Sequence, residues 1–132
     1  WQFDTPDRKA HFVALQPSDR PLPAGYFRVT TRRGKQFNSM VQERKDAITG
    51  ALREAILMNP VDIEALQLQP GDRICLTNEQ GCYWGNVYPA PVKPGNLQIH
   101  WPEGNHLLDR TKRSPIGGVP DYNAIVQISK GE

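Results

Sequence analysis

The stretch TRRGKQFNSM at 31–40 concentrates groups that bind anions and form hydrogen bonds. Arg32, Arg33 and Lys35 surround Gly34, and two amides and a hydroxyl follow within a few residues. Glycine lets a ligand approach the backbone closely, and a guanidinium fork can clamp a phosphate through two parallel hydrogen bonds. The stretch is therefore a candidate site for a phosphate-bearing ligand.

Two further clusters of polar and aromatic side chains fall at predicted strand ends. The segment HWPEGNHLL places Trp101, Glu103 and Asn105 in a turn after a strand, and GVPDYNA places Tyr122 and Asn123 just before the last strand. Binding groups are usually carried by loops that a rigid scaffold positions. Each loop alone is equally well read as a solvated turn, but three such loops favour a binding site.

Familiar catalytic and metal-binding patterns are missing from the sequence. It contains no GxSxG, HExxH or GxGxxG motif, and the Gly-Lys pair of the first stretch lacks the rest of a Walker A loop. His100, Glu103 and His106 could bind a metal, but the proline kink after Trp101 and the missing second shell of partners favour ordinary polar loop residues. We expect no catalytic residue and no metal site, and interpret the chain as a binding domain.

Short strands are expected to carry these loops. Twelve prolines and eleven glycines in 132 residues interrupt the chain at short intervals, which favours β-structure over long helices. A hairpin is predicted at 72–88, with Glu79 and Gln80 in its turn. Further strands are predicted at 9–15, 25–31, 96–101 and 123–129.

The predicted hairpin register also bears on the cysteines. It places Cys82 opposite Thr77 and Cys75 opposite Trp84, so the two thiols do not face each other. Two cysteines are too few for a disulfide framework, and there is no pair of CxxC motifs for zinc. We expect both thiols to be buried and structural, in a reduced, cytoplasmic setting.

Helical signals are few. Asn59 suits the N-cap of a helix, Pro60 suits its first position, acidic residues follow in the first turn, and the Pro-Gly pair at 70–71 ends the element. A weaker helical pattern runs over 46–56, where apolar residues recur at helical spacing but a glycine interrupts them.

The length and composition are those of a single soluble domain. A chain of 132 residues can bury a core without disulfides or metals. No apolar run approaches the roughly eighteen residues of a membrane span. Because the sequence begins at Trp1 with neither an initiator methionine nor a leader, we expect it to be a fragment of a longer protein.

Together these segments resemble the C-terminal molybdopterin-dinucleotide-binding domain of the molybdopterin oxidoreductases, especially the formate-dehydrogenase-like alpha subunits. The likeness runs from FDTPDRKAHF through RVTTRRGKQFNSMV, ILMNPVDIEALQLQPGDRICLTNEQG and VKPGNLQIHWPEGNHLL to GVPDYNAIVQI, nearly the whole chain. The pieces GKQFNSM and HWPEGN point to the formate-dehydrogenase-like branch. Arg8 departs from the family pattern, because the lead-in usually has glycine there.

The resemblance implies a mainly β fold with short helices, a six-stranded double-psi β-barrel of the aspartate-decarboxylase-like type. Residues 1–132 would form one domain, the C-terminal part of a larger enzyme, and one wall of its cofactor site. The bis(molybdopterin guanine dinucleotide) cofactor, with molybdenum or tungsten, would lie between this wall and the remaining domains, and the substrate would be formate or a similarly small molecule. The metal's protein ligand and any iron–sulfur cluster would belong to absent domains, so the isolated chain is expected to be non-catalytic.

Carried over by position, the resemblance assigns cofactor-binding residues to all three loops. They are Thr31, Arg32, Arg33, Gln36, Asn38 and Ser39 in the first loop, and Trp101, Glu103, Asn105, Tyr122 and Asn123 in the other two.

A small basic β-barrel that binds single-stranded nucleic acid is the alternative. It is suggested by RRGK and by RTKR at 110–113, with Trp84 and Trp101 available for stacking on bases. The net charge of +2 falls short of the concentrated positive charge usual in such proteins. A self-processing barrel like aspartate decarboxylase would need a Gly-Ser cleavage site, and the sequence has no such dipeptide.

Overall fold

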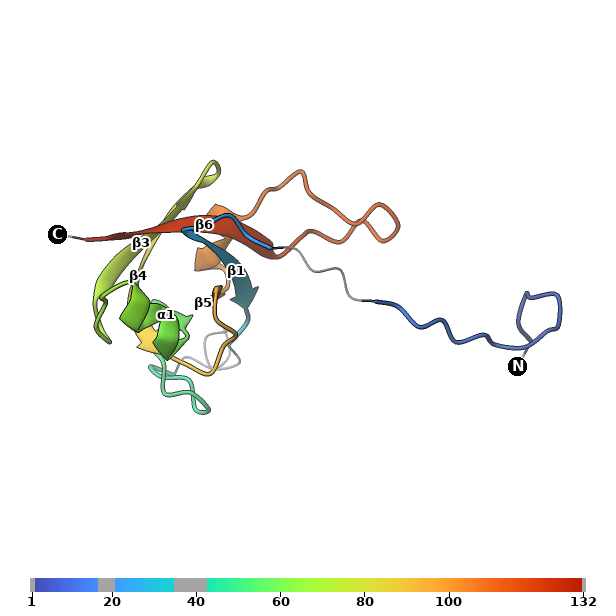
Figure 1. Ribbon diagram of the computed structural model, residues 1–132, viewed down its shortest axis with the longest axis horizontal. Helices are drawn as coiled ribbons and strands as arrows, with labels where there is room; N and C mark the ends of the chain where they lie inside the picture. Colours follow the sequence, from blue (N-terminus) through green and yellow to red (C-terminus); the bar gives the residue numbers. More distant parts are fainter. Residues whose placement is uncertain (1, 17–20, 35–42, 132) are drawn as a thin grey trace.

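Six strands close into a barrel in the computed structural model, which describes residues 2–16, 21–34 and 43–131 (Figure 1). Around the barrel the strand order is β1-β5-β2-β4-β3-β6. The pairs β1–β5 and β2–β4 are parallel, and the other four neighbouring pairs are antiparallel. The elements are β1 (Tyr26–Arg32), β2 (Ala55–Met58), α1 (Pro60–Ala65), β3 (Arg73–Asn78), β4 (Gly81–Pro89), β5 (Asn96–His100), the 3₁₀ helix η1 (Glu103–Leu107) and β6 (Asn123–Lys130).

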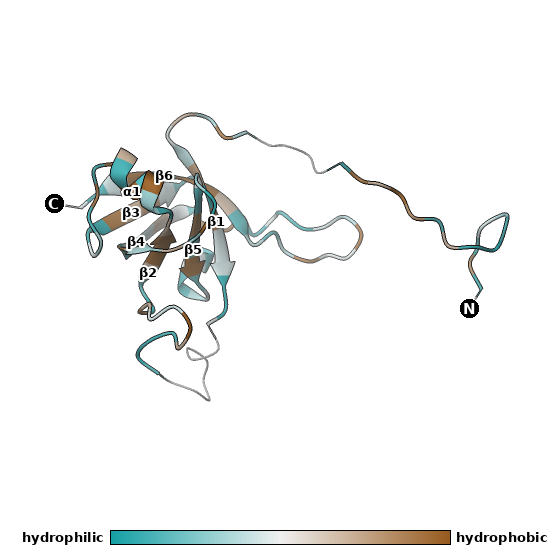
Figure 2. Cartoon of the chain, turned by 60° about the horizontal axis from the view of Figure 1, so that its bottom comes forward, coloured by the Kyte–Doolittle hydropathy of each residue, from teal (hydrophilic) through white to brown (hydrophobic). Residues whose placement is uncertain are grey.

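The barrel interior is filled by one face of each strand. In β1, Phe27 and Val29 are buried while Tyr26 points outward, as the two-residue period of a strand requires. Figure 2 shows hydrophobic residues concentrated on strands such as β2 and β5. The largest fully buried apolar side chains of this core are Val29, Ile56, Met58, Ile74, Leu76, Val87, Leu97, Ile99, Leu107 and Val126.

Most of the predicted strands are confirmed. β1, β5 and β6 occupy the positions expected for them, and β3 and β4 form the predicted hairpin. Its turn is held by Asn78 Oδ1, which accepts hydrogen bonds from the backbone N–H of Gln80 at 2.9 Å and of Gly81 at 3.3 Å. The predicted pairs of Cys75 with Trp84 and Thr77 with Cys82 are present.

The expectation for the two thiols is confirmed for one and wrong for the other. Both cysteines are free, Cys75 is buried, and Cys82 is exposed. Cys82 alternates with Tyr83 along β4, and since Tyr83 is buried in the core, Cys82 must point outward.

The helix α1 begins as predicted and ends earlier. Asn59 Oδ1 accepts from the N–H of Val61 at 2.8 Å, and Pro60 is the first helical residue. The helix ends at Ala65 rather than at the Pro-Gly pair, because the chain turns at Gln67, whose φ is 54°. This turn brings Leu68 back into the core, where it is buried.

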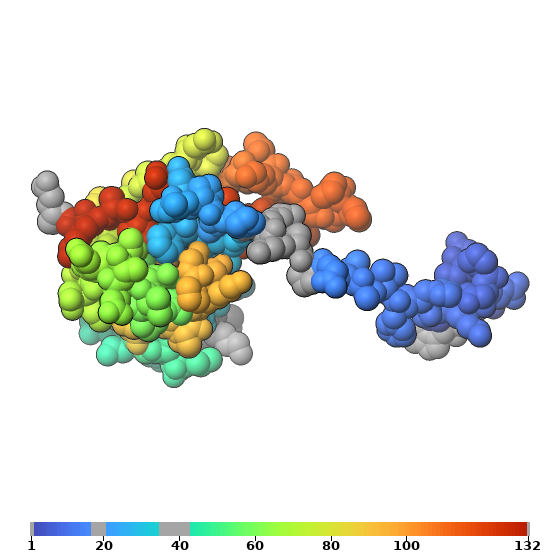
Figure 3. Space-filling view, viewed as in Figure 1, coloured from blue at the N-terminus to red at the C-terminus, as the bar shows by residue number. Residues whose placement is uncertain are grey.

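Two predicted elements are wrong. Residues 46–56 form turns rather than a helix: Gly50 has a φ of 73°, outside the helical range, and the last two residues of the range belong to β2. Residues 9–15 form no strand, because they lie outside the barrel with no strand beside them to pair with (Figures 1 and 3). Phe12, Val13 and Leu15 are exposed there.

The lead-in around Arg8 keeps a glycine-like turn without glycine. Arg8 has a φ of 56°, in the left-handed region, and its N–H donates to the carbonyl oxygen of Thr5 at 2.9 Å. Asp7 Oδ1 lies within hydrogen-bond distance of the Thr5 hydroxyl, the N–H of Lys9 and the ring of His11. For a non-glycine residue this backbone costs about 1 to 2 kcal/mol, which these local contacts help to offset.

No helix in the described part of the chain has the length and hydropathy of a membrane span.

Candidate functional site

The strand register brings the three predicted loops to one end of the barrel. β1 and β5 run parallel with Arg32 opposite His100, so the segments that follow them leave from the same end. β6 runs antiparallel to β1 with Asn123 opposite Thr30, so the segment before β6 arrives at that end too. We call this end, made of residues 31–34, 101–105 and 121–123, the loop rim.

Backbone hydrogen bonds join the loops at the rim. The N–H of Trp101 donates to the carbonyl oxygen of Arg32 at 2.8 Å, which continues the β1–β5 pairing by one step. The N–H of Thr31 donates to the carbonyl oxygen of Tyr122 at 3.3 Å. One ligand at this rim could therefore contact all three loops.

Most of the predicted cofactor-binding residues can be located at this rim. Gln36, Asn38 and Ser39 lie outside the described residues. The others are Thr31, Arg32, Arg33, Trp101, Glu103, Asn105, Tyr122 and Asn123, and all eight belong to the loop rim.

Arg33 and Trp101 stack on each other across two loops. The Arg33 guanidinium carbon lies 5.5 Å from the Trp101 ring centroid, and both side chains are exposed. A cation over an indole is attracted by the ring and is held in place while its N–H groups stay accessible.

Arg32 lies between two acceptors. Its Nη2 donates to Asp46 Oδ2 at 3.3 Å, and its Nη1 lies 3.5 Å from Gln98 Oε1 on β5. Asp46 is almost completely buried, whereas 28% of the Arg32 side chain is exposed. The partly exposed Arg32 guanidinium therefore contacts a buried carboxylate, that of Asp46.

Glu103 and Asn105 present buried acceptors that lack donors. Arg53 Nε donates to Glu103 Oε1 at 2.6 Å, but among the described residues nothing donates to Glu103 Oε2 or to Asn105 Oδ1, both of which are buried. A buried acceptor without a donor costs about 1 to 3 kcal/mol. A ligand with N–H groups at this position would remove that cost.

Of the other rim residues, Asn123 and Thr31 support the structure and Tyr122 is open to solvent. Asn123 donates from its N–H and from Nδ2 to Asp121 Oδ1, at 3.0 and 2.8 Å, so it fixes the turn that precedes β6. A Cβ at Gly104 would lie 3.0 Å from Thr31 Cγ2, which means that the Thr31 methyl packs under η1. Tyr122 is exposed.

His100 lies beneath the rim. It is fully buried, and its Nδ1 is 3.0 Å from the carbonyl oxygen of Arg53. Burial lowers the pKa of His100, and the nearby charge of Arg32 lowers it further, whereas the hydrogen bond to Arg53 acts in the opposite direction. The ring is therefore neutral at neutral pH. Within the described ranges, no group of three or more His, Cys, Asp or Glu side chains could hold a metal ion.

Asp46 and Arg53 are the residues that the sequence analysis missed. They contact Arg32 and Glu103 across 14 and 50 positions of sequence, and no local pattern reports such pairs. The only local signal was the Thr-Gly pair after Asp46, which favours a turn.

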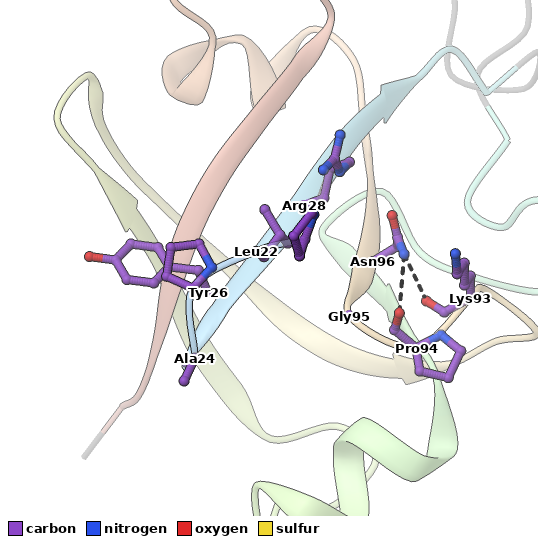
Figure 4. A pocket seen from close by; sticks show the side chains of 11 residues that line it. Leu22, Ala24, Tyr26, Arg28, Lys93, Pro94, Gly95 and Asn96 are labelled. Atoms are coloured by element: carbon purple, nitrogen blue, oxygen red, sulfur yellow. Dashed lines mark hydrogen bonds between the residues drawn. The ribbon is translucent and has the colours of Figure 1, made fainter. Parts of the chain in front are cut away.

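Two of the hollows lined by described residues lie away from the centre of the rim. One of about 680 Å³ lies at the opposite end of β1, between Tyr26, Arg28 and the turn before β5 (Figure 4). In that turn Asn96 Nδ2 donates to the carbonyl oxygens of Lys93 and Pro94. A second hollow, of about 620 Å³, lies along β1 and β6 and reaches the rim only at its edge. The loop rim is distinguished by converging strand ends and buried acceptors rather than by volume.

The family of the chain follows from a comparison with family models. Residues 26–126 match the model of the molydopterin dinucleotide binding domain, so the chain belongs to this family. The match covers β1 to β5 and reaches into β6, and so includes the described residues of all three loops.

Similar proteins include oxidoreductases of bacteria. An uncharacterized oxidoreductase of Mycobacterium tuberculosis is 28% identical over 140 residues, which covers 95% of this chain and 18% of that protein. Protein YdeP of Escherichia coli is 22% identical over 135 residues, which covers 92% of this chain and 18% of that protein. The chain thus spans about 18% of the length of these relatives.

Solved structures confirm the fold. A rationally designed double-psi β-barrel protein matches with a TM-score of 0.52 and 19% identity, over 81% of this chain and 97% of its own. An expansin of Clavibacter michiganensis matches with a TM-score of 0.52 and 12% identity, over 82% of this chain and 50% of its own. The six-stranded double-psi β-barrel implied by the resemblance is therefore correct.

Proposed function

We propose that the chain binds the bis(molybdopterin guanine dinucleotide) cofactor at the loop rim, as the C-terminal domain of a formate-dehydrogenase-like oxidoreductase. Membership of the dinucleotide-binding family supports the ligand. The name of the similar oxidoreductase from Mycobacterium tuberculosis supports a redox enzyme. The short span of the match in both relatives supports a larger parent chain. The observation that carries the proposal is the meeting at one rim of two arginines and two buried acceptors that have no donor among the described residues.

The chemistry of these residues fits the two halves of such a ligand. Arg32 and Arg33 suit the phosphates, because charge-assisted hydrogen bonds from a guanidinium are about twice as strong as neutral ones. In the part of the chain that the structure describes, Glu103 Oε2 and Asn105 Oδ1 have no hydrogen-bond donors. The pterin and the guanine each carry an amino group and ring N–H groups that could supply them.

The residues of this chain orient the cofactor and do not react. When bound, the cofactor's metal, molybdenum or tungsten, supplies two-electron redox chemistry. The chain contributes cations that bind phosphate and acceptors that align a heterocycle, and the remaining domains of the parent enzyme would close the site. The isolated chain should therefore bind without catalysing a reaction. The exposed free thiol of Cys82 suits a reducing compartment such as the cytoplasm.

Titration calorimetry with molybdopterin guanine dinucleotide tests the proposal. Arg32→Glu and Arg33→Glu should each weaken binding at least about tenfold, because each removes a charge-assisted contact and adds repulsion. Arg73→Glu is the matched control: Arg73 stacks on Trp84, and the β3–β6 register places it at the opposite end of the barrel. Equal affinity for the two rim variants and the unsubstituted chain would rule out the proposal.

Nucleic-acid binding gains less support from the arrangement of the aromatic residues. Trp84 lies on the outer face of β4, opposite Cys75, whereas Trp101 lies at the loop rim, so the two rings do not form one stacking platform. Oligonucleotide affinity that falls steeply between low and moderate salt would nevertheless favour this alternative.

A further inference from the structure

The turn after Asp46 gives its two carboxylate oxygens different partners. Oδ1 accepts from the backbone N–H groups of Ile48 at 2.8 Å and Thr49 at 3.1 Å. Oδ2 accepts from Arg32 Nη2 at 3.3 Å. One oxygen therefore builds the turn, and the other faces an arginine of the loop rim.

Hydrogen bonds fix the conformation of the turn that carries this carboxylate. The N–H of Asp46 donates to the carbonyl oxygen of Ala51 at 2.8 Å, and the N–H of Gly50 donates back to the carbonyl oxygen of Asp46 at 2.7 Å. The Tyr88 hydroxyl, from β4, donates to the carbonyl oxygen of Thr49 at 2.5 Å. The turn is thus fixed both to itself and to the wall of the barrel.

Arg32 is restrained on its other side by the neighbouring strand. Its Nη1 lies 3.5 Å from Gln98 Oε1, while Nη2 contacts Asp46. A guanidinium has five N–H donors, and these two contacts use one from each terminal nitrogen. Two N–H donors of the Arg32 guanidinium therefore have protein partners, while part of the side chain stays exposed to solvent.

We propose that Asp46 is a positioning residue, which holds the Arg32 guanidinium in the orientation that binds a phosphate group of the cofactor. This inference rests on the proposed function, and it adds a residue from outside the three loops. An ordered arginine loses less rotamer entropy when a ligand binds, and buried carboxylates orient such groups in many binding sites.

Two other roles for Asp46 make different predictions. If the carboxylate only supports the turn, its loss should weaken binding whether or not Arg32 is present. If it acts only as a nearby negative charge, its loss should strengthen phosphate binding, because it reduces the local positive potential.

Asp46→Asn separates these roles. The asparagine oxygen can still accept from Ile48 and Thr49, so the turn is kept. Its amide group, a donor, replaces the oxygen that faces Arg32, so the hold on the guanidinium is lost. Asp62→Asn is the matched control, because Asp62 Oδ2 accepts from the backbone N–H of Gly95 at 2.8 Å, at the end of β5 away from the rim.

The binding test is a double-mutant cycle on the 132-residue chain, which closes its own barrel around its own core. The probe is molybdopterin guanine dinucleotide, and the variants are Asp46→Asn, Arg32→Ala and both together. Asp46→Asn should weaken binding about tenfold when Arg32 is present and cause no further loss in the Arg32→Ala background. Equal losses in both backgrounds, no loss, or tighter binding would each overturn the inference.

A second readout needs no ligand. Nuclear magnetic resonance of the arginine side chains should show slow rotation of the Arg32 guanidinium in the unsubstituted chain and faster rotation in Asp46→Asn, with no change in Asp62→Asn. Equal rotation rates in all three would contradict the positioning role. If the unsubstituted chain fails to bind the probe, the proposed function itself fails; if it binds and only Asp46→Asn has no effect, the failure belongs to this inference alone.

Discussion

At the scale of single residues, two charged side chains of the loop rim are held by partners from one segment, residues 43–54. Asp46 contacts Arg32, and Arg53 contacts Glu103. The Arg53–Glu103 pair is about two-fifths exposed on both sides, and such pairs add only about 0 to 1 kcal/mol to stability. Its larger effect is on orientation, because it engages one oxygen of Glu103 and leaves the other for a donor.

His100 should make the stability of the domain depend on pH in a defined window. The charges of Arg32, Asp46 and Glu103 act on its ring, and burial is the largest cause of its lowered pKa. At pH values well above the unfolded pKa of about 6.5 the ring is neutral in both states and contributes no pH dependence. As the pH falls below that value, the unfolded chain takes up a proton first, so the folded state loses stability by at most about 1.4 kcal/mol per pH unit.

Urea denaturation at pH 7.5 and 5.5 checks this prediction. The unsubstituted chain should lose more stability between the two pH values than His100→Asn, whose amide can still donate to the Arg53 carbonyl oxygen. An identical pH dependence in both proteins would mean that the folded and unfolded forms of His100 bind a proton equally well.

At the scale of elements, η1 depends on a close approach to β5. A Cβ at Gly104 would lie 2.6 Å from Ile99 Cδ1 and 3.0 Å from Thr31 Cγ2, so the helix packs directly on the buried Ile99 side chain and on the Thr31 methyl. Gly104→Ala should push η1 outward, lower the free energy of unfolding by about 1 to 3 kcal/mol, and weaken cofactor binding by displacing Glu103 and Asn105.

Gly117→Ala is the control for this prediction. A Cβ there would lie 3.6 Å from its nearest neighbour, Val119 Cγ2, which is ordinary contact. Denaturant unfolding and calorimetry on both variants separate packing from a general effect of losing a glycine. Unchanged stability and affinity in Gly104→Ala would show that η1 can move without consequence.

The elements also show what the sequence could predict. β1, β4 and β6 alternate between buried and exposed residues, and that alternation is visible in the chain. β2 was missed because all four of its residues, AILM, are buried, so it has no alternation to detect. Residues 9–15 have strand propensity, but propensity forms a strand only where another strand is available to pair.

The candidate site was predictable to a similar degree. The loops 31–34, 101–105 and 121–123 could be identified because their residue types are unusual and each lies at a strand end. Their meeting at one rim depends on which strands are parallel, and the supports of Arg32 and Glu103 depend on contacts between distant residues. Neither kind of information is encoded in a local pattern.

At the scale of the whole molecule, barrel closure separates a rigid body from an extended arm, residues 2–16. Each strand of the barrel pairs on both sides, so the barrel has no free edge. The arm extends away from it in Figures 1 and 3. Within the described part of the chain, the hydrogen bonds of the arm join residues of the arm to one another, as in the turn of Thr5 and Arg8.

Deletion of residues 1–16 should therefore leave the stability of the barrel unchanged. Phe12, Val13 and Leu15 are largely exposed and gain little from folding of this chain. If they packed on the barrel, each would contribute about 1.5 to 3 kcal/mol, and the deletion would lower the melting temperature by many degrees. Scanning calorimetry of the truncated and full chains distinguishes the two outcomes.

Deletion of β6 serves as the destabilised control for the arm deletion in the same calorimetry experiment. β6 pairs with both β1 and β3, so its loss opens the barrel and exposes two edges at once. It also removes Val126 from the core and Asn123 from the loop rim. This variant should not fold cooperatively, whereas the arm deletion should keep both the melting temperature and the affinity for molybdopterin guanine dinucleotide. A loss of affinity at an unchanged melting temperature would instead mean that the arm takes part in holding the ligand.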